Sequence, residues 1–323
     1  MTFLLVGLAS GLASATLSIS LLSGSMLAVL LFMFAPLPIL IASIGWNHRA
    51  GLVGVAVACV ALFALTGFAT ARGYAVSIGL PAWWLGYLAL LARPAGDTPE
   101  AGMDWYPVGR LVVWSAALGA GLIVLTILLS GSISAYRDVL RATFDTFLRQ
   151  EAGTPAGAPI ELPGGGDAAR LADLAVMALP PVGAALWTAN TLFNLWLAGR
   201  ISRASDRLTR PWPDLAALEL PPLALMVFAV ALLGAFIPGF GFVLGVVAAA
   251  FGIAFALLGL AFLHASTRGV NGRTLMLATT YILLAVQTWT VIVLAVLGIL
   301  EQVFGMRARA AARRGPPTPP AHR

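Results

Sequence analysis

Charged residues are scarce in this chain. Only 10% of its 323 residues are Asp, Glu, Lys or Arg, whereas soluble domains carry about 25%. Several windows of 18 or more residues hold no charge, and each is long enough to cross about 30 Å of hydrocarbon. The composition excludes a soluble protein and predicts an all-α, polytopic transmembrane helix bundle whose surroundings are the lipid bilayer.

Lysine is absent, and all 19 basic residues are Arg. Without Lys, the chain cannot form a P-loop, which ends in Gly-Lys-Ser/Thr. The abundance of Ala, Gly and Pro indicates a GC-rich genome, so we expect a bacterial cytoplasmic (inner) membrane. The Arg residues fall mainly in loops and the tail, where they orient a membrane protein. The high pI therefore does not predict nucleic-acid binding.

The side chains that carry most enzyme chemistry are also missing. The single cysteine, Cys59, allows neither an internal disulfide nor a cysteine-based metal site. The three histidines, His48, His264 and His322, lie far apart and form no zinc-binding motif. No Asp or Glu falls inside a predicted span, which argues against a proton-coupled pump. We therefore expect no catalytic residues, no metal, no cofactor and no enzymatic activity.

The apolar runs divide the chain into helical spans. We predict about nine spans, with eight as the alternative, at residues 3–21, 26–44, 51–70, 75–92, 108–130, 180–199, 222–238, 242–264 and 275–300. The Pro-Gly-Phe-Gly sequence at 238–241 predicts a tight turn, so the seventh and eighth spans form a hairpin.

Residues 131–179 interrupt the spans. Their first part has apolar residues at helical spacing and charges on other faces, which predicts an amphipathic surface helix. A flexible linker follows, and then Asp167 caps a short helix that ends at Pro180–Pro181. The predicted organisation is therefore 1–130 with five spans, 131–179, 180–303 with four spans, and a disordered basic tail at 304–323.

Arginine is concentrated in one set of short loops. With nine spans, one side of the membrane holds Arg49, Arg93, Arg110, Arg200, Arg203, Arg207, Arg210, Arg268 and Arg273. The positive-inside rule places those loops and the N-terminus in the cytoplasm. Three spans then separate the Arg200–Arg210 loop from the basic tail, so the tail is predicted on the opposite side.

Polar side chains follow one face of the sixth span. Trp187, Asn190, Thr191 and Asn194 recur at helical spacing. Two interpretations are open: the asparagines hydrogen-bond a neighbouring helix, or the face lines a pocket for a polar ligand.

Two other spans offer partners for that face. The fourth span carries Trp83, Trp84 and Tyr87 near its middle, away from the interfaces where aromatic residues are usual. They pack the bundle core or line a cavity. In the ninth span, Gln287 is a candidate partner for the asparagines of the sixth.

The first span contains the sequence GLASGLASA. Gly7, Ala9, Gly11, Ala13 and Ala15 give it a thin face. A thin face lets another helix approach closely and gain van der Waals contact. We therefore expect a close helix contact here, part of it with a separate membrane protein.

Three strings carry a family resemblance: LPAWWLGYLALLARP (80–94), MDWYPVGRLVVW (103–114) and NTLFNLWLAGRI (190–201), followed by RPWPDL (210–215). In these strings the chain resembles the YybS-like family, domain of unknown function 2232, of bacterial membrane proteins. The resemblance implies an integral membrane protein and no particular activity.

A more distant likeness concerns the first helix. The spacing of Ala9 and Ala13 is similar to a motif in substrate-binding subunits of energy-coupling-factor vitamin transporters, which implies docking on a coupling subunit. We therefore expect a substrate-binding or transport-related membrane subunit with a pocket lined from spans four, six and nine. The alternative is a membrane scaffold or assembly factor with no small-molecule ligand.

Overall fold

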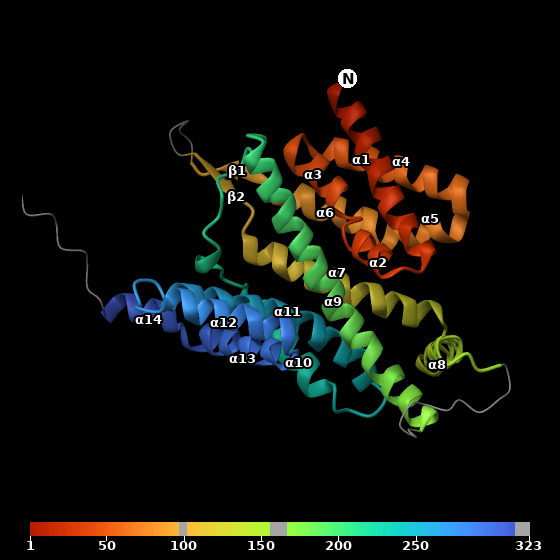
Figure 1. Cartoon of the computed structure of the whole chain (residues 1–323). Coiled ribbons are helices and arrows are strands. Elements are labelled where there is room, and N and C mark those ends of the chain that lie inside the picture. The colour runs from red at the N-terminus through yellow and green to blue at the C-terminus, as the bar shows by residue number, and fades with distance from the viewer. Residues whose placement is uncertain (97–101, 156–166, 314–323) are drawn as a thin grey trace, which may run out of the picture.

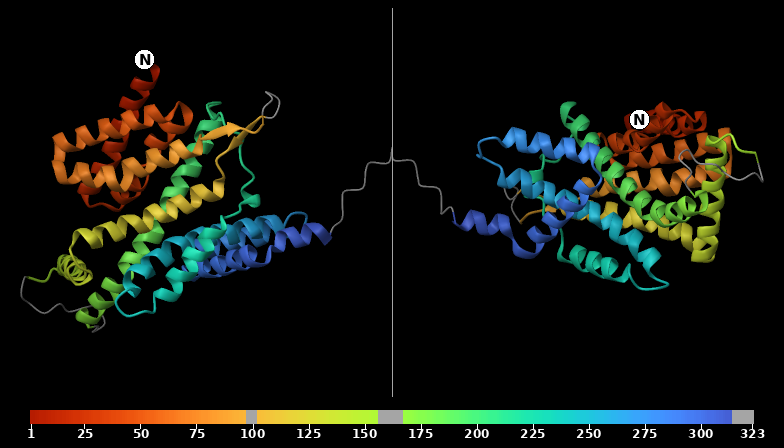
Figure 2. Two further views of the ribbon diagram at one scale, coloured as in Figure 1. Left: turned by 180° about the vertical axis from the view of Figure 1, so that it is seen from behind. Right: turned by 60° about the horizontal axis from the view of Figure 1, so that its bottom comes forward.

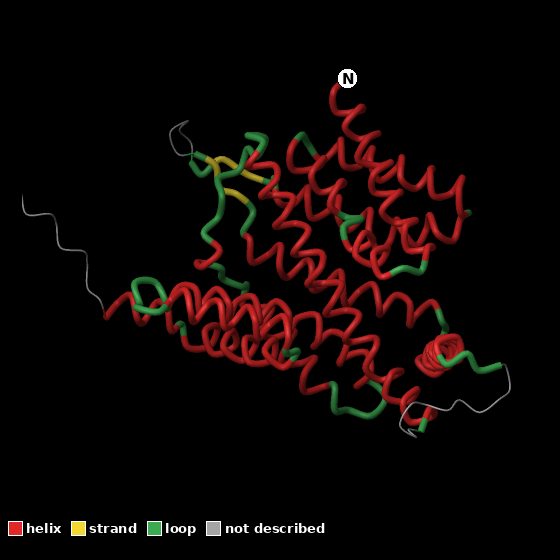
Figure 3. Tube along the Cα trace, in the orientation of Figure 1, coloured by secondary structure: helices red, strands yellow, loops and turns green. Residues whose placement is uncertain are grey.

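The computed structural model describes residues 1–96, 102–155 and 167–313, and these form a helix bundle with one small β-hairpin (Figures 1 and 3). The N-terminal elements are α1 (Thr2–Ile19), η1 (Ser20–Ser23), α2 (Met26–Met33), α3 (Leu37–Gly45), α4 (His48–Thr66), α5 (Phe68–Tyr74), the π-helical η2 (Ala75–Gly79), α6 (Leu80–Ala89), β1 (Ala92–Pro94) and β2 (Met103–Trp105). The later elements are α7 (Val108–Leu129), α8 (Ile133–Glu151), α9 (Ala168–Ala204), η4 (Leu215–Ala217), α10 (Pro222–Gly234), α11 (Gly241–Ser266), α12 (Arg273–Val286), α13 (Trp289–Phe304) and α14 (Met306–Arg313).

Two groups of helices lie on either side of a central pair. Figures 1 and 2 show α1 to α6 in one group, α10 to α14 in the other, and α7 and α9 between them. α9 packs against α3 on one side and against α11 on the other. The long helix α9 therefore joins the two groups and gives both a shared framework.

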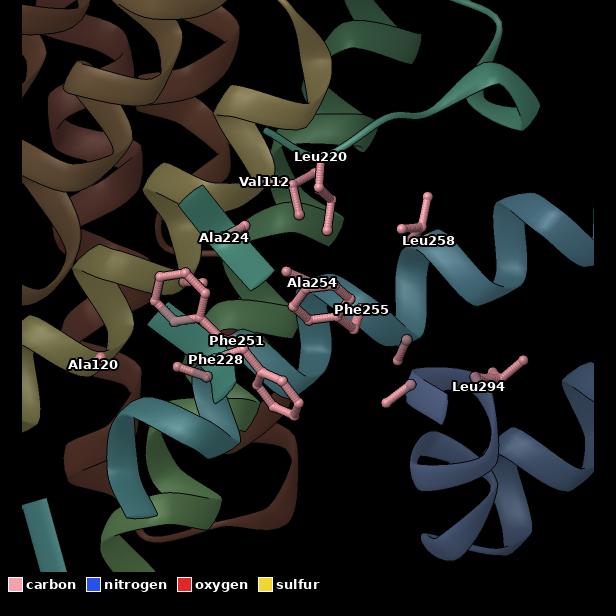
Figure 4. Close-up of a cluster of buried hydrophobic side chains, with 14 of the residues drawn as sticks. Val112, Ala120, Leu220, Ala224, Phe228, Phe251, Ala254, Phe255, Leu258 and Leu294 are labelled. Atoms are coloured by element: carbon pink, nitrogen blue, oxygen red, sulfur yellow. The ribbon is translucent and has the colours of Figure 1, made fainter. Parts of the chain in front are cut away.

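The largest apolar core lies where α7, α9, α10, α11 and α13 meet. Figure 4 shows Phe228 of α10 and Phe251 and Phe255 of α11 in this core. The rings of Phe228 and Phe255 lie 5.0 Å apart between centroids. Because lipid supplies no hydrophobic force between helices, such close packing has to provide the attraction.

The all-α membrane bundle is confirmed. Six helical segments in the described part of the chain are long and apolar enough to cross a membrane: Thr2–Ser23, Met26–Gly45, His48–Thr66, Val108–Leu129, Ala168–Ala204 and Gly241–Ser266. The hairpin expected at 238–241 is also present, since α10 packs on α11 and the Gly241 amide bonds the Ile237 carbonyl.

The helix that begins after Asp167 is longer than predicted. The Asp167 carboxylate caps it by accepting the Ala169 amide at 2.9 Å, as expected. The helix does not end at Pro180–Pro181 but continues to Ala204. Neighbouring helices cover α9 at this point, since Pro180 and Ala184 are both buried, and such packing lets a membrane helix continue through proline. The predicted division at 179/180 thus falls inside α9, and the predicted linker lies largely in residues 156–166, outside the described residues.

The amphipathic helix is α8, and it packs on the bundle. Ser132 caps it by accepting the Ala135 amide at 3.0 Å. An ion pair joins Arg141 to Asp173 of α9, and the Arg137 guanidinium lies 5.0 Å from the Phe242 ring centroid. These contacts fix one end of α8 against α9 and α11.

The predicted ninth span, 275–300, is two helices rather than one. α12 has 14 residues and α13 has 16, and Gln287 between them is extended, with φ −124° and ψ 107°. The chain reverses there: α11 packs on η4, and Arg307, just after α13, donates to the Ala216 carbonyl of η4, so α11 and α13 end at the same end of the molecule (Figure 1). Neither Gly nor Pro marks this break, so the apolar run gave no sign of it.

The reversal changes the predicted place of the tail. Arg307 donates to the carbonyls of Ala216 and Leu218 at 2.6 and 2.7 Å and pairs with Glu301 at 2.7 Å. The chain after α13 therefore returns to the end that holds the Arg200–Arg210 loop, and the expectation of opposite sides is wrong. Residues 306–313 are helical rather than disordered, and residues 314–323 lie outside the described residues.

We name this the arginine-rich end. It gathers the loops that follow α6, α9, α11 and α13, with Arg93, Arg203, Arg210, Arg268 and Arg307. Two contacts tie these loops together: Arg210 donates to the Ala89 carbonyl of α6 at 3.1 Å, and Arg268 pairs with Asp214 at 2.8 Å.

Candidate functional site: the interruption in the second span

The second predicted span is interrupted in its middle. α2 ends at Met33 and α3 begins at Leu37, with a turn between them. Pro36 and Pro38 have no amide hydrogens, and in this turn the Leu37 amide donates to the Phe34 carbonyl rather than to the Met33 carbonyl. Backbone carbonyls are therefore left open at a depth where no water is at hand to satisfy them.

The asparagines of α9 satisfy the first of these carbonyls. The Asn190 and Asn194 side-chain amides donate to the Met33 carbonyl at 3.1 and 2.9 Å. Asn194 also donates to the Asn190 carbonyl at 2.9 Å. The polar face predicted on the sixth span therefore includes a structural bond to the broken helix.

A second pair of side chains satisfies the next carbonyl. Ser14 of α1 donates to the Ala35 carbonyl at 2.6 Å. The Tyr74 hydroxyl lies 2.6 Å from the Ser14 oxygen. Because the single Ser14 hydrogen is already used, Tyr74 is the donor in that contact. Side chains of three helices, α1, α5 and α9, thus meet at the interruption between α2 and α3.

Trp187 performs a similar role at the fourth span. Its indole nitrogen donates to the Ser77 carbonyl at 2.9 Å. Pro81 has no amide hydrogen to give the carbonyl four residues before it, which is that of Ser77. The π-helical segment Ala75–Gly79 lies at the same place. Trp187 thus compensates for the bond that Pro81 removes.

The aromatic residues of α6 form a packed group. The rings of Trp83 and Tyr87 stack with centroids 6.3 Å apart, and Tyr87 lies edge-on to His48 at 5.3 Å. Trp83 donates to the His48 carbonyl at 3.0 Å. Trp84 contacts Trp114 at 5.5 Å, and its buried indole nitrogen has no hydrogen-bond partner. These rings join α6 to α4 and α7.

Gln287 does not reach the asparagines. Gln287 is exposed in the turn between α12 and α13, and its backbone N–H donates to the Leu283 carbonyl at 2.7 Å. The asparagines instead bond α2, in the other helix group. The expectation of one pocket lined from spans four, six and nine therefore fails at the ninth span.

One acceptor at the interruption remains open. The Asn194 side chain is fully buried, and among the described residues its Oδ1 atom has no hydrogen-bond partner. Thr191, one turn away, is also buried. A buried, unpaired amide oxygen costs free energy unless a donor reaches it. The interruption therefore combines an irregular backbone with an unused acceptor, and this makes it our candidate site.

Two cavities are found elsewhere, at the arginine-rich end. One, of about 480 Å³, is lined by the β-hairpin around Arg93 and Asp104. The other, of about 260 Å³, lies beside Trp212. Neither is lined by the residues named on spans four, six and nine. Among the described residues, no group of three His, Cys, Asp or Glu side chains could hold a metal ion.

The thin face of α1 divides into two. Gly7, Gly11 and Ala15 are buried, and the two glycines pack on α4. They are not free for a separate protein, which corrects that part of the predicted docking face. Ala9 and Ala13 are exposed and remain a candidate contact.

We expect Asn194→Leu to destabilise the protein by about 1–2 kcal/mol, because interhelical hydrogen bonds in membranes contribute up to about that much. Thermal unfolding of the purified variant in detergent measures the loss. Thr16→Leu is the control, since Thr16 is exposed and bonds only the Leu12 carbonyl of its own helix. Equal melting temperatures for the Asn194 variant and the native chain would contradict the structural role.

Comparison with known proteins supports the family and nothing finer. No curated protein and no solved structure matches the chain. The likeness to energy-coupling-factor subunits therefore has no support. A family model described as "Predicted membrane protein (DUF2232)" matches residues 12–301. Because that match covers most of the chain, the protein belongs to the DUF2232 family of multi-pass membrane proteins.

Proposed function

We propose that the chain is a transport-related subunit of the bacterial inner membrane, without catalysis of its own. The observation that carries this proposal is the unpaired Asn194 Oδ1 atom beside the interruption between α2 and α3. The site would take a small, uncharged solute with a hydrogen-bond donor.

Interrupted helices support this proposal. In membrane proteins, non-helical backbone at depth is tolerated where protein buries it or where it lines a water-filled cavity. Transporters often place their substrate sites at such interruptions, between half-helices. Here the interruption is contacted by Ser14 of α1, Tyr74 of α5 and two asparagines of α9. A solute that reached Asn194 would meet groups from four segments.

A scaffold role is the second candidate. The observation in its favour is that both asparagine amide groups donate to the chain's own carbonyls. In that case the interruption is a packing feature, and the exposed Ala9 and Ala13 on α1 serve a protein contact. The two candidates differ in whether water reaches the interruption.

Cysteine labelling separates them. In a Cys59→Ala background, which removes the single native thiol, we expect Asn190→Cys to react with a charged, membrane-impermeant methanethiosulfonate reagent. A transport pathway brings water and the reagent to this half-buried position. Labelling in intact vesicles, read by mass spectrometry, measures the accessibility.

Two matched variants bracket the result. Ser25→Cys lies in an exposed loop and should label fully. Leu186→Cys, on the same helix as Asn190 but 65% exposed on its outer face, should contact lipid and stay unlabelled. If Asn190→Cys behaves like Leu186→Cys, no aqueous path exists and the scaffold role is the better account.

A further inference from the structure

A hollow at the arginine-rich end combines positive charge with an aromatic ring. Its volume is about 260 Å³, and it lies where α9 ends and the chain turns toward η4. It is lined by Arg203, Asp206, Leu208, Arg210 and Trp212. Unlike the interruption in the second span, it opens among loops rather than within the bundle.

The two guanidinium groups in this hollow lack an acidic partner. In the part of the chain that the structure describes, no carboxylate oxygen lies within 4.0 Å of Arg203 or Arg210. Arg203 lies over the Trp212 ring at 5.5 Å, and Arg210 donates to the Ala89 carbonyl at 3.1 Å. Burial lowers the pKa of Arg210, because the charged guanidinium loses water contacts. An anion beside Arg210 would stabilise the charged form and offset this loss.

The nearby acids are used elsewhere. Asp214 pairs with Arg268 at 2.8 Å, and that hydrogen bond lowers the pKa of the Asp214 carboxyl. Glu301 pairs with Arg307. The remaining positive charge of the hollow is therefore available to a ligand, with Asp206 as the one acid that lines it.

The surroundings of the hollow indicate the depth of lipid headgroups. It adjoins the end of a membrane helix, and the ring of Trp212 forms part of its wall. Trp212 lies close against α9, since a Cβ at Gly199 would be 3.3 Å from the ring. A second tryptophan, Trp46, lies between α3 and α4. The Arg207 guanidinium lies over its ring, 5.1 Å from the ring centroid. Tryptophan is enriched at the membrane–water interface, so this end contacts the headgroup layer.

We propose that this hollow binds the phosphodiester of an anionic phospholipid whose headgroup carries hydroxyl groups. Guanidinium groups donate paired hydrogen bonds to phosphate oxygens, as Arg203 and Arg210 would here. Asp206 would accept a hydrogen bond from a headgroup hydroxyl. Phosphatidylcholine carries no net charge, because its quaternary ammonium offsets its phosphate, so the two arginines would favour the anionic glycerol lipid. Basic pockets on the cytoplasmic side of membrane helices bind anionic headgroups in this way.

Native mass spectrometry of the purified full chain tests the proposal. The probes are dioleoylphosphatidylglycerol and dioleoylphosphatidylcholine, titrated separately. We expect the glycerol lipid to bind at least about tenfold more tightly. We expect Arg203→Gln with Arg210→Gln to remove that preference, because charge-assisted hydrogen bonds are the strong ones. Arg49→Gln is the matched control: it removes one exposed charge outside the hollow and should bind as the native chain does.

Further variants keep the test decisive. If the double variant does not fold, the single variant Arg203→Gln replaces it, since Arg203 is exposed and its loss should still weaken phosphatidylglycerol binding. Equal binding of the two lipids to the native chain would overturn the proposal. So would equal binding of phosphatidylglycerol to the double variant and to the native chain. Full displacement of the lipid by equimolar sn-glycerol 3-phosphate would assign the hollow to a soluble phosphate and overturn the lipid source.

Discussion

Gly7→Leu combined with Gly11→Leu is expected to abolish the folded protein. A Cβ at Gly7 would lie 2.6 Å from Val53 Cγ1 and 2.9 Å from the Ala50 carbonyl oxygen of α4. A Cβ at Gly11 would collide with the Gly54 carbonyl oxygen. Overpacking costs about 1–3 kcal/mol even where side chains can shift, and here the obstacle includes backbone. The double variant would therefore overfill two points of the same contact between α1 and α4.

Size-exclusion chromatography of the detergent-solubilised variant measures this loss, as the disappearance of the monodisperse peak. Ala9→Leu with Ala13→Leu is the matched control, because it places two leucines on the same helix at exposed positions. That control should elute like the native chain. If instead the control aggregates and the glycine variant elutes normally, the face of α1 that packs on α4 has been assigned the wrong way round.

Green fluorescent protein fused after Arg323 is expected to fluoresce in cells. The tag is fluorescent only in the cytoplasm, and the arginine-rich loops belong there by the positive-inside rule. Arg307 bonds the carbonyls of Ala216 and Leu218, so the chain after α13 lies on the side of those loops. Whole-cell fluorescence, normalised to the amount of fusion protein in the membrane, is the measurement.

A truncation fused after Gly239 serves as the control, since the turn between α10 and α11 lies one helix away from the arginine-rich end. It should be dark. A dark full-length fusion would mean that α12 and α13 cross the membrane as one span. The two helices would then have to open from the reversed arrangement at Gln287.

The thin first helix shows how far sequence reasoning reaches. The small residues in GLASGLASA predict a close helix contact, and α4 supplies it. Spacing alone did not distinguish Gly7 and Gly11, which are buried, from Ala9 and Ala13, which are exposed. Both pairs are small residues four apart, and only the position of α4 decides which side is covered.

The polar face of α9 gives a similar lesson. Helical spacing placed Trp187, Asn190 and Asn194 together, which the structure bears out in one respect: all three donate to backbone carbonyls of other helices. Pro81 frees the Ser77 carbonyl, whereas the Met33 carbonyl is open because the Leu37 amide donates to the Phe34 carbonyl instead. The prolines are visible in the sequence, but which distant side chain meets each open carbonyl depends on how the helices pack.

Local features of the sequence were enough to predict the lipid surroundings, the helical class and the main helices. These follow from local quantities: charge density, apolar run length, and caps such as Asp167, which act within a few residues. The tertiary structure alone decided the passage of α9 through Pro180–Pro181, the reversal at Gln287 and the side on which the tail lies. At these places the hydropathy of the residues does not distinguish a continuous helix from an interrupted one. The difference lies in contacts with helices far away in the chain, such as η4 with Arg307, and no local pattern records those contacts.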